Sequence, residues 1–273
     1  MTRRHRVLMC APDYFTVSYA INPWMAGEEG EVSRSRARSQ WDTLRETLAE
    51  SAEVALLDPA DGLPDMVFTA NAGVVYQGRA IVSRFGPAER RGEEPHFRAW
   101  FENDGYEIVE WPEELLFEGA GDVLLDRAEP WVWAGYGQRT QRAAHEELAG
   151  FYPDREVVSM HLVDPHYYHI DTCLQPLEGG YLMYFPEAFD ETGLAEIERR
   201  IPKERRIPVT ADEASGFACN AVNLDRRVVF NEPAERLRGE LEKAGFAVTG
   251  VTLSEFLKSG GAAKCLVLRL DEP

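Results

Sequence analysis

The sequence predicts a mixed α/β fold built from five repeated units, and two observations lead to this prediction. One plan recurs about every fifty residues: a strand or hairpin, then a polar amphipathic helix, then a closing strand. In addition, no long segment rich in Pro, Gly or Ser divides the 273 residues, so we expect a single domain spanning residues 1–273. Units that bury their apolar faces only against neighbouring units favour a pseudo-fivefold α/β propeller. An ordinary three-layer α/β fold is the alternative.

Each unit is predicted from short apolar runs bounded by turn residues, with a polar helix between them. The first unit contains strand 7–10, helix 36–50 and strand 54–57. The second contains a hairpin formed by 66–68, 74–76 and 80–82, with a turn at Gln77-Gly78, then helix 97–103 and strand 107–109. The third contains strands 123–125 and 131–133, helix 141–149 and strand 157–160. The fourth contains strands 170–174 and 181–184, helix 194–200 and strand 207–209. The fifth contains strands 221–224 and 228–230, helix 233–244 and strand 248–251. A last apolar strand is predicted at 266–270.

Composition limits the range of partners. The chain is 44% hydrophobic and 28% charged, which is typical of a globular protein. Its formal net charge of -18 argues against nucleic acid and anionic membranes as partners and favours small cationic ligands. Solubility alone is another explanation of this acidity. The oligomeric state does not follow from the sequence.

The cysteines and the N-terminus indicate a cytoplasmic protein. Cys10, Cys173, Cys219 and Cys265 lie far apart in the sequence, which fits reduced thiols better than disulfides or a zinc site. The segment 1–6 is basic, but the apolar run after it is too short for a signal peptide or a membrane span.

No metal site is expected. His161, His166 and His169 cluster in the sequence, but Pro165 interrupts the stretch and it is predicted as loop into strand. A shared helical face for metal binding is therefore not expected.

Cys265 is the candidate nucleophile. It ends the glycine-containing segment 260–265, just before the predicted strand 266–270. A thiol at such a position can be exposed at the edge of the strand, where a lowered pKa would make it nucleophilic. A buried cysteine of the core is the structural alternative.

Two further motifs supply acid and base groups. If His169-Ile170-Asp171 is a strand, its period of two places the imidazole and the carboxylate on one face. Glu118 lies among small residues that leave room for a substrate. A cysteine, a histidine and two carboxylates suit nucleophilic attack on a cationic carbon. The structural alternative is that His169 is a histidine of the core and Glu118 a solvated turn residue.

Four motifs resemble the guanidine-modifying enzymes, which include arginine deiminase, dimethylargininase and arginine:glycine amidinotransferase. These motifs occupy residues 64–71, 117–122, 169–172 and 260–265, and the similarity extends over nearly the whole chain. The opening segments 9–15 and 21–25 look most like bacterial arginine dihydrolases. The resemblance implies a pseudo-fivefold α/β propeller, in agreement with the repeats.

The resemblance also implies roles for individual residues. It makes Cys265 the nucleophile and His169 the general acid and base, while Glu118 and Asp171 bind the guanidinium group. Arg90 and Arg139 match positions that hold the substrate carboxylate, for which an arginine fork is well suited. Within its charged stretch, Arg90 could instead be a surface residue.

Asn71 stands where arginine deiminases carry an aspartate. Unlike a carboxylate, an amide can donate as well as accept hydrogen bonds, so Asn71 suits both the cation and a neutral urea. With Asn22, it suggests a pocket that processes arginine and then holds citrulline for a second attack. Asn71 as the cap of a turn is the alternative.

The predicted reaction is the hydrolysis of arginine through a covalent thiouronium on Cys265. Two successive hydrolyses would give ornithine, ammonia and carbon dioxide, without an organic cofactor or metal. The nearest rival is a deiminase or dimethylargininase that stops after one hydrolysis. An amidinotransferase and a non-catalytic protein that binds a cationic amino acid are two more rivals. The sequence does not distinguish arginine from methylated arginine as substrate.

Overall fold

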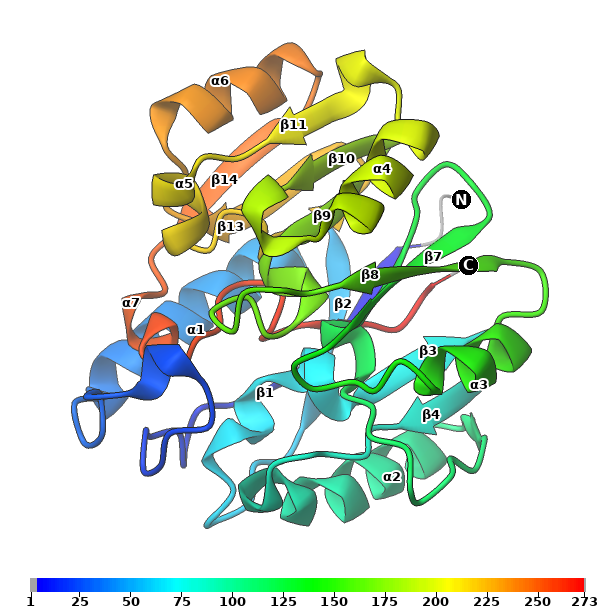
Figure 1. Cartoon of the computed structure of the whole chain (residues 1–273). Coiled ribbons are helices and arrows are strands. Elements are labelled where there is room, and N and C mark those ends of the chain that lie inside the picture. Colours follow the sequence, from blue (N-terminus) through cyan, green and yellow to red (C-terminus); the bar gives the residue numbers. More distant parts are fainter. Residues whose placement is uncertain (1–3, 273) are drawn as a thin grey trace. The chain divides into compact units, whose positions relative to one another are not determined.

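The computed structural model describes residues 4–272 of the chain. Residues 1–3, on which part of the argument about the N-terminus depends, lie outside the described residues. The described part is a mixed α/β fold with seven α-helices and five three-stranded sheets, and Figure 1 labels most of these elements. The chain divides into two compact units: unit 1 comprises Met1–Ala120 and Leu253–Pro273, and unit 2 comprises Gly121–Thr252.

Unit 1 contains two of the sheets. The first has the order β15-β1-β2, with β15 (Leu268–Arg269), β1 (His5–Cys10) and β2 (Ala52–Leu57). The second has the order β3-β4-β5, with β3 (Gly73–Tyr76), β4 (Arg79–Val82) and β5 (Glu107–Ile108). The helices of unit 1 are α1 (Arg34–Ala49), α2 (Glu94–Asn103) and α7 (Ser254–Leu257).

Unit 2 contains the other three sheets. The sheet β6-β7-β8 consists of β6 (Val123–Leu125), β7 (Trp131–Tyr136) and β8 (Glu156–His161). The sheet β9-β10-β11 consists of β9 (Leu174–Leu177), β10 (Tyr181–Tyr184) and β11 (Arg206–Pro208). The sheet β12-β13-β14 consists of β12 (Val222–Leu224), β13 (Arg227–Asn231) and β14 (Ala247–Val251). The helices of unit 2 are α3 (Ala144–Phe151), α4 (Glu191–Arg200), α5 (Ala211–Ser215) and α6 (Glu235–Lys243).

All five sheets share one pairing pattern. In each, the middle strand pairs antiparallel with one neighbour and parallel with the other. The parallel strand follows a helix, because a parallel pair needs a long crossover connection. This pattern confirms the predicted plan of a strand or hairpin, then a helix, then a closing strand. Across residues 4–272, five separate sheets replace the single central sheet that a three-layer fold would require.

The first sheet is completed by the C-terminal end of the chain. Strand β15 pairs antiparallel with β1, so that Leu268 lies opposite Leu8. Both side chains belong to the buried apolar cluster of unit 1, together with Phe97 and Phe101 from α2. A separate cluster of buried apolar side chains forms the core of unit 2. In that unit, α6 packs on β14 (Figure 1).

Local sequence explains the tight turns. Gln77 and Gly78 connect β3 to β4, and both have positive φ angles, of 49° and 79°. Two consecutive residues with positive φ are characteristic of a type I′ turn, whose twist matches a two-residue hairpin. The turn predicted at Gln77-Gly78 is therefore confirmed.

Two predicted strand segments are wrong. Residues 66–68 fall in and directly after the 3-10 helix η2 (Pro64–Val67), and Ile170–Thr172 form the 3-10 helix η6. The strand predicted at 266–270 is reduced to Leu268–Arg269. Segments as short as these have too few residues for a periodicity that separates a strand from a buried turn, and this explains the errors.

The structure also bears on membrane association. Within residues 4–272, no helix combines the length and the apolar character needed to cross a bilayer.

Candidate functional site

Four candidate residues occupy the same kind of position in the repeated plan. Each lies in a turn directly before the first strand of a sheet. Asn71 is in the 3-10 helix η3 (Thr69–Ala72) before β3, and Glu118 precedes η5 (Gly119–Gly121) and β6. Asp171 is in η6 before β9, and Cys265 is in the turn before β15. All four side chains are buried.

Cys265 is held against the segment that carries Asn71. The backbone N–H of Ala70 donates to the carbonyl of Cys265 at 3.1 Å, and Thr69 Oγ1 donates to the carbonyl of Leu266 at 2.9 Å. Only 2% of Cys265 is exposed, so the prediction of an exposed thiol at a strand edge is wrong. The turn, rather than the strand, carries this residue, and the surrounding segments cover it.

Packing around Cys265 explains the glycine in its motif. A Cβ at Gly261 would lie 2.6 Å from the Phe68 ring, which is closer than side-chain atoms approach. Phe68 in turn packs edge-on against Phe15 and Phe256. The segment that leads to Cys265 can therefore pass close to the aromatic cluster only with glycine at 261.

Glu118 is anchored inside unit 1. The backbone N–H of Gly86 donates to Glu118 Oε1 at 3.3 Å, and Asn71 Nδ2 donates to the Glu118 carbonyl at 3.4 Å. The following residue, Gly119, has φ +63°, and a Cβ there would lie 2.9 Å from backbone atoms of Gly73. Glu118 is thus a fixed, buried carboxylate rather than a solvated turn residue.

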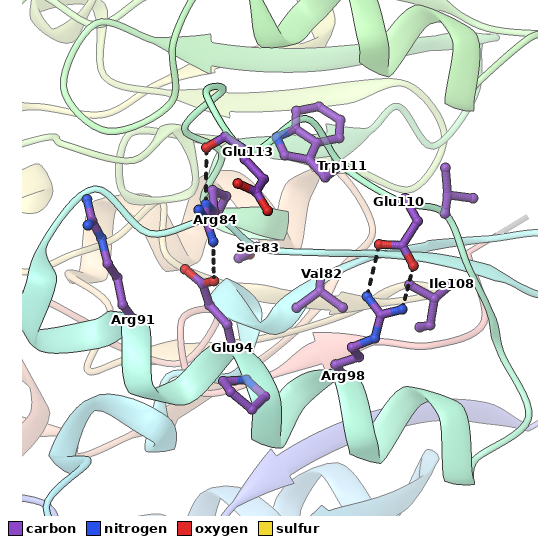
Figure 2. A pocket seen from close by; sticks show the side chains of 12 residues that line it. Val82, Ser83, Arg84, Arg91, Glu94, Arg98, Ile108, Glu110, Trp111 and Glu113 are labelled. Atoms are coloured by element: carbon purple, nitrogen blue, oxygen red, sulfur yellow. Dashed lines mark hydrogen bonds and ion pairs between the residues drawn. The ribbon is translucent and has the colours of Figure 1, made fainter.

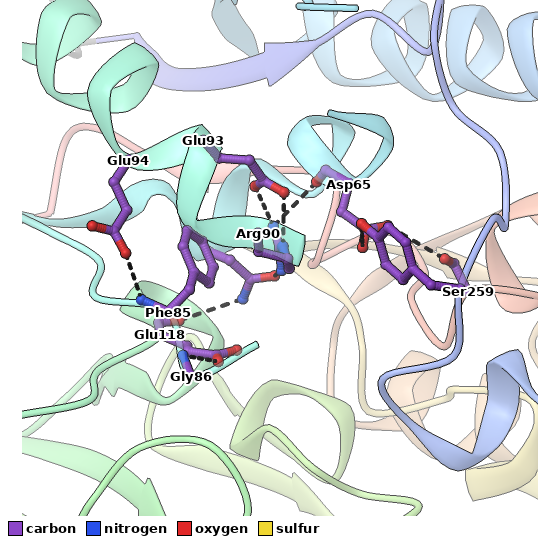
Figure 3. Close-up of polar contacts among 10 residues, drawn as sticks. Asp65, Phe85, Gly86, Arg90, Glu93, Glu94, Glu118 and Ser259 are labelled. Atoms are coloured by element: carbon purple, nitrogen blue, oxygen red, sulfur yellow. Dashed lines mark hydrogen bonds and ion pairs between the residues drawn. The ribbon is translucent and has the colours of Figure 1, made fainter. Parts of the chain in front are cut away.

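Arg90 is buried at the centre of a polar network (Figure 3). It lies on the 3-10 helix η4 (Ala88–Glu93) and donates from Nε and Nη2 to Glu93 at 3.0 and 2.8 Å. Nη1 donates to Asn71 Oδ1 at 2.8 Å, and Nη2 also donates to the Asp65 carbonyl at 3.1 Å. The guanidinium lies 4.4 Å from the Phe85 ring centroid. Arg90 is therefore no surface residue.

Asp65, Asn71, Arg90, Glu93 and Glu118 form what we call the buried polar cluster. Its three carboxylates and one guanidinium give a formal charge of -2. Burial raises the pKa of Glu93 to about 7, although Arg90 acts in the opposite direction. Excess negative charge away from water is costly unless a cation compensates it. The cluster therefore favours a cationic ligand.

Neighbouring side chains complete the surroundings of Asp65. Tyr19 donates its hydroxyl hydrogen to Asp65 Oδ2 at 2.8 Å, and burial raises the pKa of this tyrosine, an effect that Asp65 increases. Ser259 Oγ lies 3.5 Å from Asp65 Oδ1 and belongs to the segment that leads to Cys265. Asp65 therefore connects the start of the chain with that segment.

Asn22 caps a short helix and contacts the segment that leads to Cys265. Its Oδ1 accepts from the backbone N–H groups of Trp24 and Met25, which caps the 3-10 helix η1 (Pro23–Met25). Its Nδ2 donates to the carbonyl of Ser259 at 3.1 Å. Both ends of the carboxamide thus bind protein groups. A direct role of Asn22 in substrate binding stays a prediction.

In unit 2, His169 is buried at the start of η6. Its carbonyl accepts from the backbone N–H and the hydroxyl of Thr172, at 3.1 and 2.6 Å. The next N–H, of Ile170, donates to Asp122 Oδ1 at 3.1 Å. The histidine ring lies 4.7 Å from the ring of Tyr168, over which Arg139 stacks at 4.8 Å. Arg139 therefore contacts Tyr168, the residue directly before His169.

The relation predicted between His169 and Asp171 is wrong in its geometry. These residues lie at a 3-10 turn, whose period is about three, so the alternation of a strand does not apply. The backbone is fixed instead by Asn220, whose Nδ2 donates to the Asp171 carbonyl at 3.0 Å. Asn220 lies just before β12, the position that corresponds to Asn71 and Cys265 in other sheets.

The remaining cysteines are poor candidates for a nucleophile. Cys10, Cys173 and Cys219 are free and buried, and burial raises the pKa of each thiol, to about 12 for Cys10. A thiol with a raised pKa has little thiolate at neutral pH.

The clustered histidines have separate partners. His161 Nδ1 lies 3.1 Å from Asp190, and His166 Nδ1 lies 3.0 Å from Asp164. In the part of the chain that the structure describes, no group of three or more His, Cys, Asp or Glu side chains is arranged to hold a metal ion.

A surface pocket of about 370 Å³ lies elsewhere in unit 1, beside α2 and β5 (Figure 2). Four of its charged side chains pair with one another: Arg98 with Glu110, and Arg84 with Glu94. None of the predicted site residues lines this pocket.

Sequence reasoning missed four residues of these networks: Tyr19, Asp65, Glu93 and Asn220. The three-residue spacing of Arg90 and Glu93 could have indicated a pair on one helical turn. The register of Asn220 in the repeat could also have been noticed. Tyr19 and Asp65 meet across 46 positions of the chain, and no local pattern indicates that contact.

Comparisons with known proteins agree with this arrangement. Residues 12–271 match the family model described as N,N dimethylarginine dimethylhydrolase, eukaryotic. The chain is 52% identical over 268 residues to the bifunctional arginine dihydrolase/ornithine cyclodeaminase ArgZ of Synechocystis. This alignment covers 98% of the chain but 38% of that protein, so the chain spans about two fifths of its relative's length.

A second relative is similar over nearly its whole length. The dimethylarginine dimethylaminohydrolase of Mycobacterium tuberculosis is 39% identical over 269 residues, which cover 98% of the chain and 86% of that protein. Among solved structures, the N-terminal domain of a substrate-bound ArgZ mutant superposes with a TM-score of 0.97 at 51% identity. That match covers 98% of the chain and 99% of the domain.

Proposed function

Because the chain belongs to the N,N-dimethylarginine dimethylhydrolase family, we propose that it hydrolyses the guanidinium group of arginine through a covalent intermediate on Cys265. The products are ornithine, carbon dioxide and ammonia, formed in two successive hydrolyses. The observation that carries this proposal is the buried polar cluster of unit 1. Its formal charge of -2 would be compensated by a guanidinium, and Asn71 of this cluster adjoins Ala70, which donates to Cys265.

In the proposed first cycle, the Cys265 thiolate attacks the guanidinium carbon. His169 protonates the ammonia that leaves, and then activates the water that hydrolyses the thiouronium. Glu118 and Asp171 bind the guanidinium, while Arg139 and Arg90 hold the α-carboxylate. Arg90 does so through the second N–H of Nη1, because its other donors bind Glu93, Asn71 and the Asp65 carbonyl. The roles of Cys265, His169, Glu118, Asp171, Arg90 and Arg139 rest on the resemblance to guanidine-modifying enzymes.

In the proposed second cycle, Cys265 attacks the ureido carbon of the bound citrulline. A second ammonia leaves, and hydrolysis of the carbamoyl thioester yields the carbamate of ornithine, which loses carbon dioxide. The two cycles consume two waters and release two ammonia, so atoms balance. Asn71 supports this extension because an amide can donate to the neutral ureido oxygen, which a carboxylate cannot do.

The family supports a second candidate, a dimethylargininase that stops at citrulline. The mycobacterial relative carries that name, and it is 39% identical to this chain. We place arginine dihydrolysis first because the ArgZ relative is 52% identical and because Asn71 stands where deiminases have aspartate. An amidinotransferase and a non-catalytic binding protein have no specific observation in their favour.

We further propose that the five sheets are the blades of one pseudo-fivefold propeller, formed by residues 1–273 as a single domain. The identical pairing pattern of the five sheets supports this proposal. A cytoplasmic location is proposed from the free cysteines and the acidic composition. The partner is a small cationic amino acid rather than nucleic acid or membrane, and we propose catalysis without a cofactor.

One experiment tests the function directly. The purified protein is incubated with arginine or with asymmetric dimethylarginine, and amino acids and ammonia are quantified over time. We expect ornithine from arginine with about two ammonia per ornithine, since each thiolate cycle releases one amine. Citrulline as the end product, with one ammonia, would show that the protein is a deiminase rather than a dihydrolase. Faster release of dimethylamine from the methylated substrate would favour the dimethylargininase.

A further inference from the structure

The orientation of the Asn71 carboxamide follows from its contact with Arg90. A guanidinium has five N–H donors and no acceptor, so the amide atom that faces it must be the oxygen. Arg90 Nη1 donates to Asn71 Oδ1 at 2.8 Å, while Asn71 Nδ2 faces the carbonyl of Glu118 at 3.4 Å. Rotating the amide by 180° would place its NH2 group against the N–H of Arg90, which is repulsive.

Arg90 is itself fixed by Glu93. The carboxylate of Glu93 accepts from Nε and Nη2 at 3.0 and 2.8 Å, and both side chains are buried (Figure 3). This bidentate contact defines the plane of the guanidinium. The bond to the Asp65 carbonyl and the Phe85 ring hold the same plane. These contacts consequently fix the direction in which Nη1 donates to Asn71.

We propose that Glu93 is a positioning residue which, through Arg90, holds the Asn71 carboxamide with its NH2 group presented to the substrate and so commits the enzyme to the second hydrolysis. Glu93 need not touch the substrate for this role. The inference rests on the proposed two-cycle function and adds the group that determines how far the reaction proceeds.

The chemistry of the intermediate explains why the orientation matters. The first hydrolysis replaces a cationic guanidinium, which only donates hydrogen bonds, by a ureido group with an oxygen that accepts them. Carboxylates such as Glu118 cannot donate to this oxygen, but Asn71 Nδ2 can. If the amide were free to rotate, it would present its oxygen part of the time and release the neutral intermediate. Citrulline would then leave before the second attack.

The test is the product ratio of Glu93→Gln. A glutamine keeps the size of the side chain but can accept from Arg90 through one oxygen only and carries no charge. At equal consumption of arginine, we expect the ratio of citrulline to ornithine to rise about tenfold, the effect of losing roughly one oriented hydrogen bond. The KM for arginine should change much less than this ratio, because the carboxylates that bind the cation remain.

Glu255→Gln is the matched control. Glu255 is also a buried carboxylate of unit 1, bonded to Arg36 and Lys258 outside the buried polar cluster. This control should lose thermal stability but keep the product ratio of the wild type. If it released as much citrulline as Glu93→Gln, the effect would come from general loosening and the positioning role would be refuted.

Two further outcomes separate this inference from the function on which it rests. A wild type that makes ornithine, with a Glu93→Gln variant of unchanged ratio, overturns the positioning role alone. A wild type that stops at citrulline overturns the two-cycle function and this inference with it. If Glu93→Gln does not fold, Glu93→Asp keeps the charge but shortens the side chain by one methylene. It should also raise the citrulline ratio, and an unchanged ratio in that variant refutes the proposal.

Discussion

Burial determines the chemical character of the polar residues in unit 1. Asp65, Glu93 and Glu118 are each less than 4% exposed, and the guanidinium of Arg90 pairs directly with Glu93. Carboxylates in such surroundings interact with a bound cation far more strongly than they would in water. The charge of these residues in unit 1 therefore favours a cation over an anion.

Cys265 is the proposed nucleophile. We expect Cys265→Ser to lose essentially all turnover yet to bind arginine, because a neutral hydroxyl is a much weaker nucleophile than a thiolate. Binding is measured by calorimetry and turnover by ammonia release. Mass spectrometry of the trapped wild-type enzyme should place the adduct on the peptide that contains Cys265. An adduct on Cys10, Cys173 or Cys219 would show that Cys265 is not the nucleophile.

Asn71→Asp should change the product rather than abolish the reaction. An aspartate can still accept from Arg90, but it cannot donate to a ureido oxygen, and its charge strengthens the hold on the cation. We therefore expect citrulline to replace ornithine as the main product. Amino-acid analysis after complete consumption of arginine measures this change. Undiminished ornithine formation would exclude Asn71 from the second cycle.

Arg139 provides a test of substrate recognition in unit 2. Its guanidinium stacks on Tyr168, next to His169. If Arg139 holds the α-carboxylate, Arg139→Ala should weaken arginine binding by roughly 1.5 to 3 kcal/mol, the value of a charge-assisted hydrogen bond. Agmatine lacks this carboxylate and should be affected much less. Equal losses for both ligands, measured by competition binding, would assign another role to Arg139.

At the scale of elements, a buried histidine joins α3 to the sheet beneath it. His145 on α3 donates from Nε2 to the Gly135 carbonyl of β7 at 3.2 Å, and its Nδ1 accepts from the Ser159 hydroxyl of β8 at 2.8 Å. Burial lowers the pKa of His145 to about 4. The neutral imidazole is thus part of the folded structure, and acid should weaken the attachment of the helix.

The lowered pKa of His145 determines how the stability of the protein depends on pH. The folded pKa lies below the value of about 6.5 for an unfolded histidine, so the contribution is complete above pH 6.5 and disappears as the pH falls towards 4. We expect protonation of His145 to lower the free energy of unfolding by about 2 kcal/mol when the pH falls from 7 to 5. Urea denaturation at both pH values measures the loss. His145→Gln should reduce the difference between the two pH values, and an unchanged difference would assign it to other groups.

At the scale of the whole molecule, the two ends of the chain meet in one sheet. Strand β15 supplies the antiparallel partner of β1, with Leu268 opposite Leu8. The first repeat therefore resembles the other four only after the last residues of the chain have been added. Cys265 precedes β15 by three residues, so formation of this sheet also determines where the proposed nucleophile lies.

Leu268→Ala tests this closure. Leu268 is buried, so its truncation should destabilise the protein by about 2 to 5 kcal/mol through lost burial and a residual cavity. Leu56, on β2 of the same sheet, is 50% exposed, and Leu56→Ala should cost less than about 0.5 kcal/mol. Denaturant unfolding of both variants measures the difference. Equal effects would mean that β15 contributes little to unit 1.

The sequence by itself determined the repeated plan of the fold. Amphipathic helices such as α1 and turns such as Gln77-Gly78 depend on neighbours within a few positions, and their patterns are visible in the chain. The same local patterns identified Cys265, His169, Glu118 and Asp171 as candidates, because small residues and turn residues surround chemically active ones.

Only the tertiary structure decided the environment of those residues. The burial of Cys265, the contact of Tyr19 with Asp65 and the orientation of Asn71 by Arg90 join positions that are far apart in the chain. Such contacts depend on how segments pack, and no periodicity along the sequence encodes them. For the same reason, the sequence of the short segment Ile170–Thr172 is compatible with a strand, but its packing makes it a 3-10 turn.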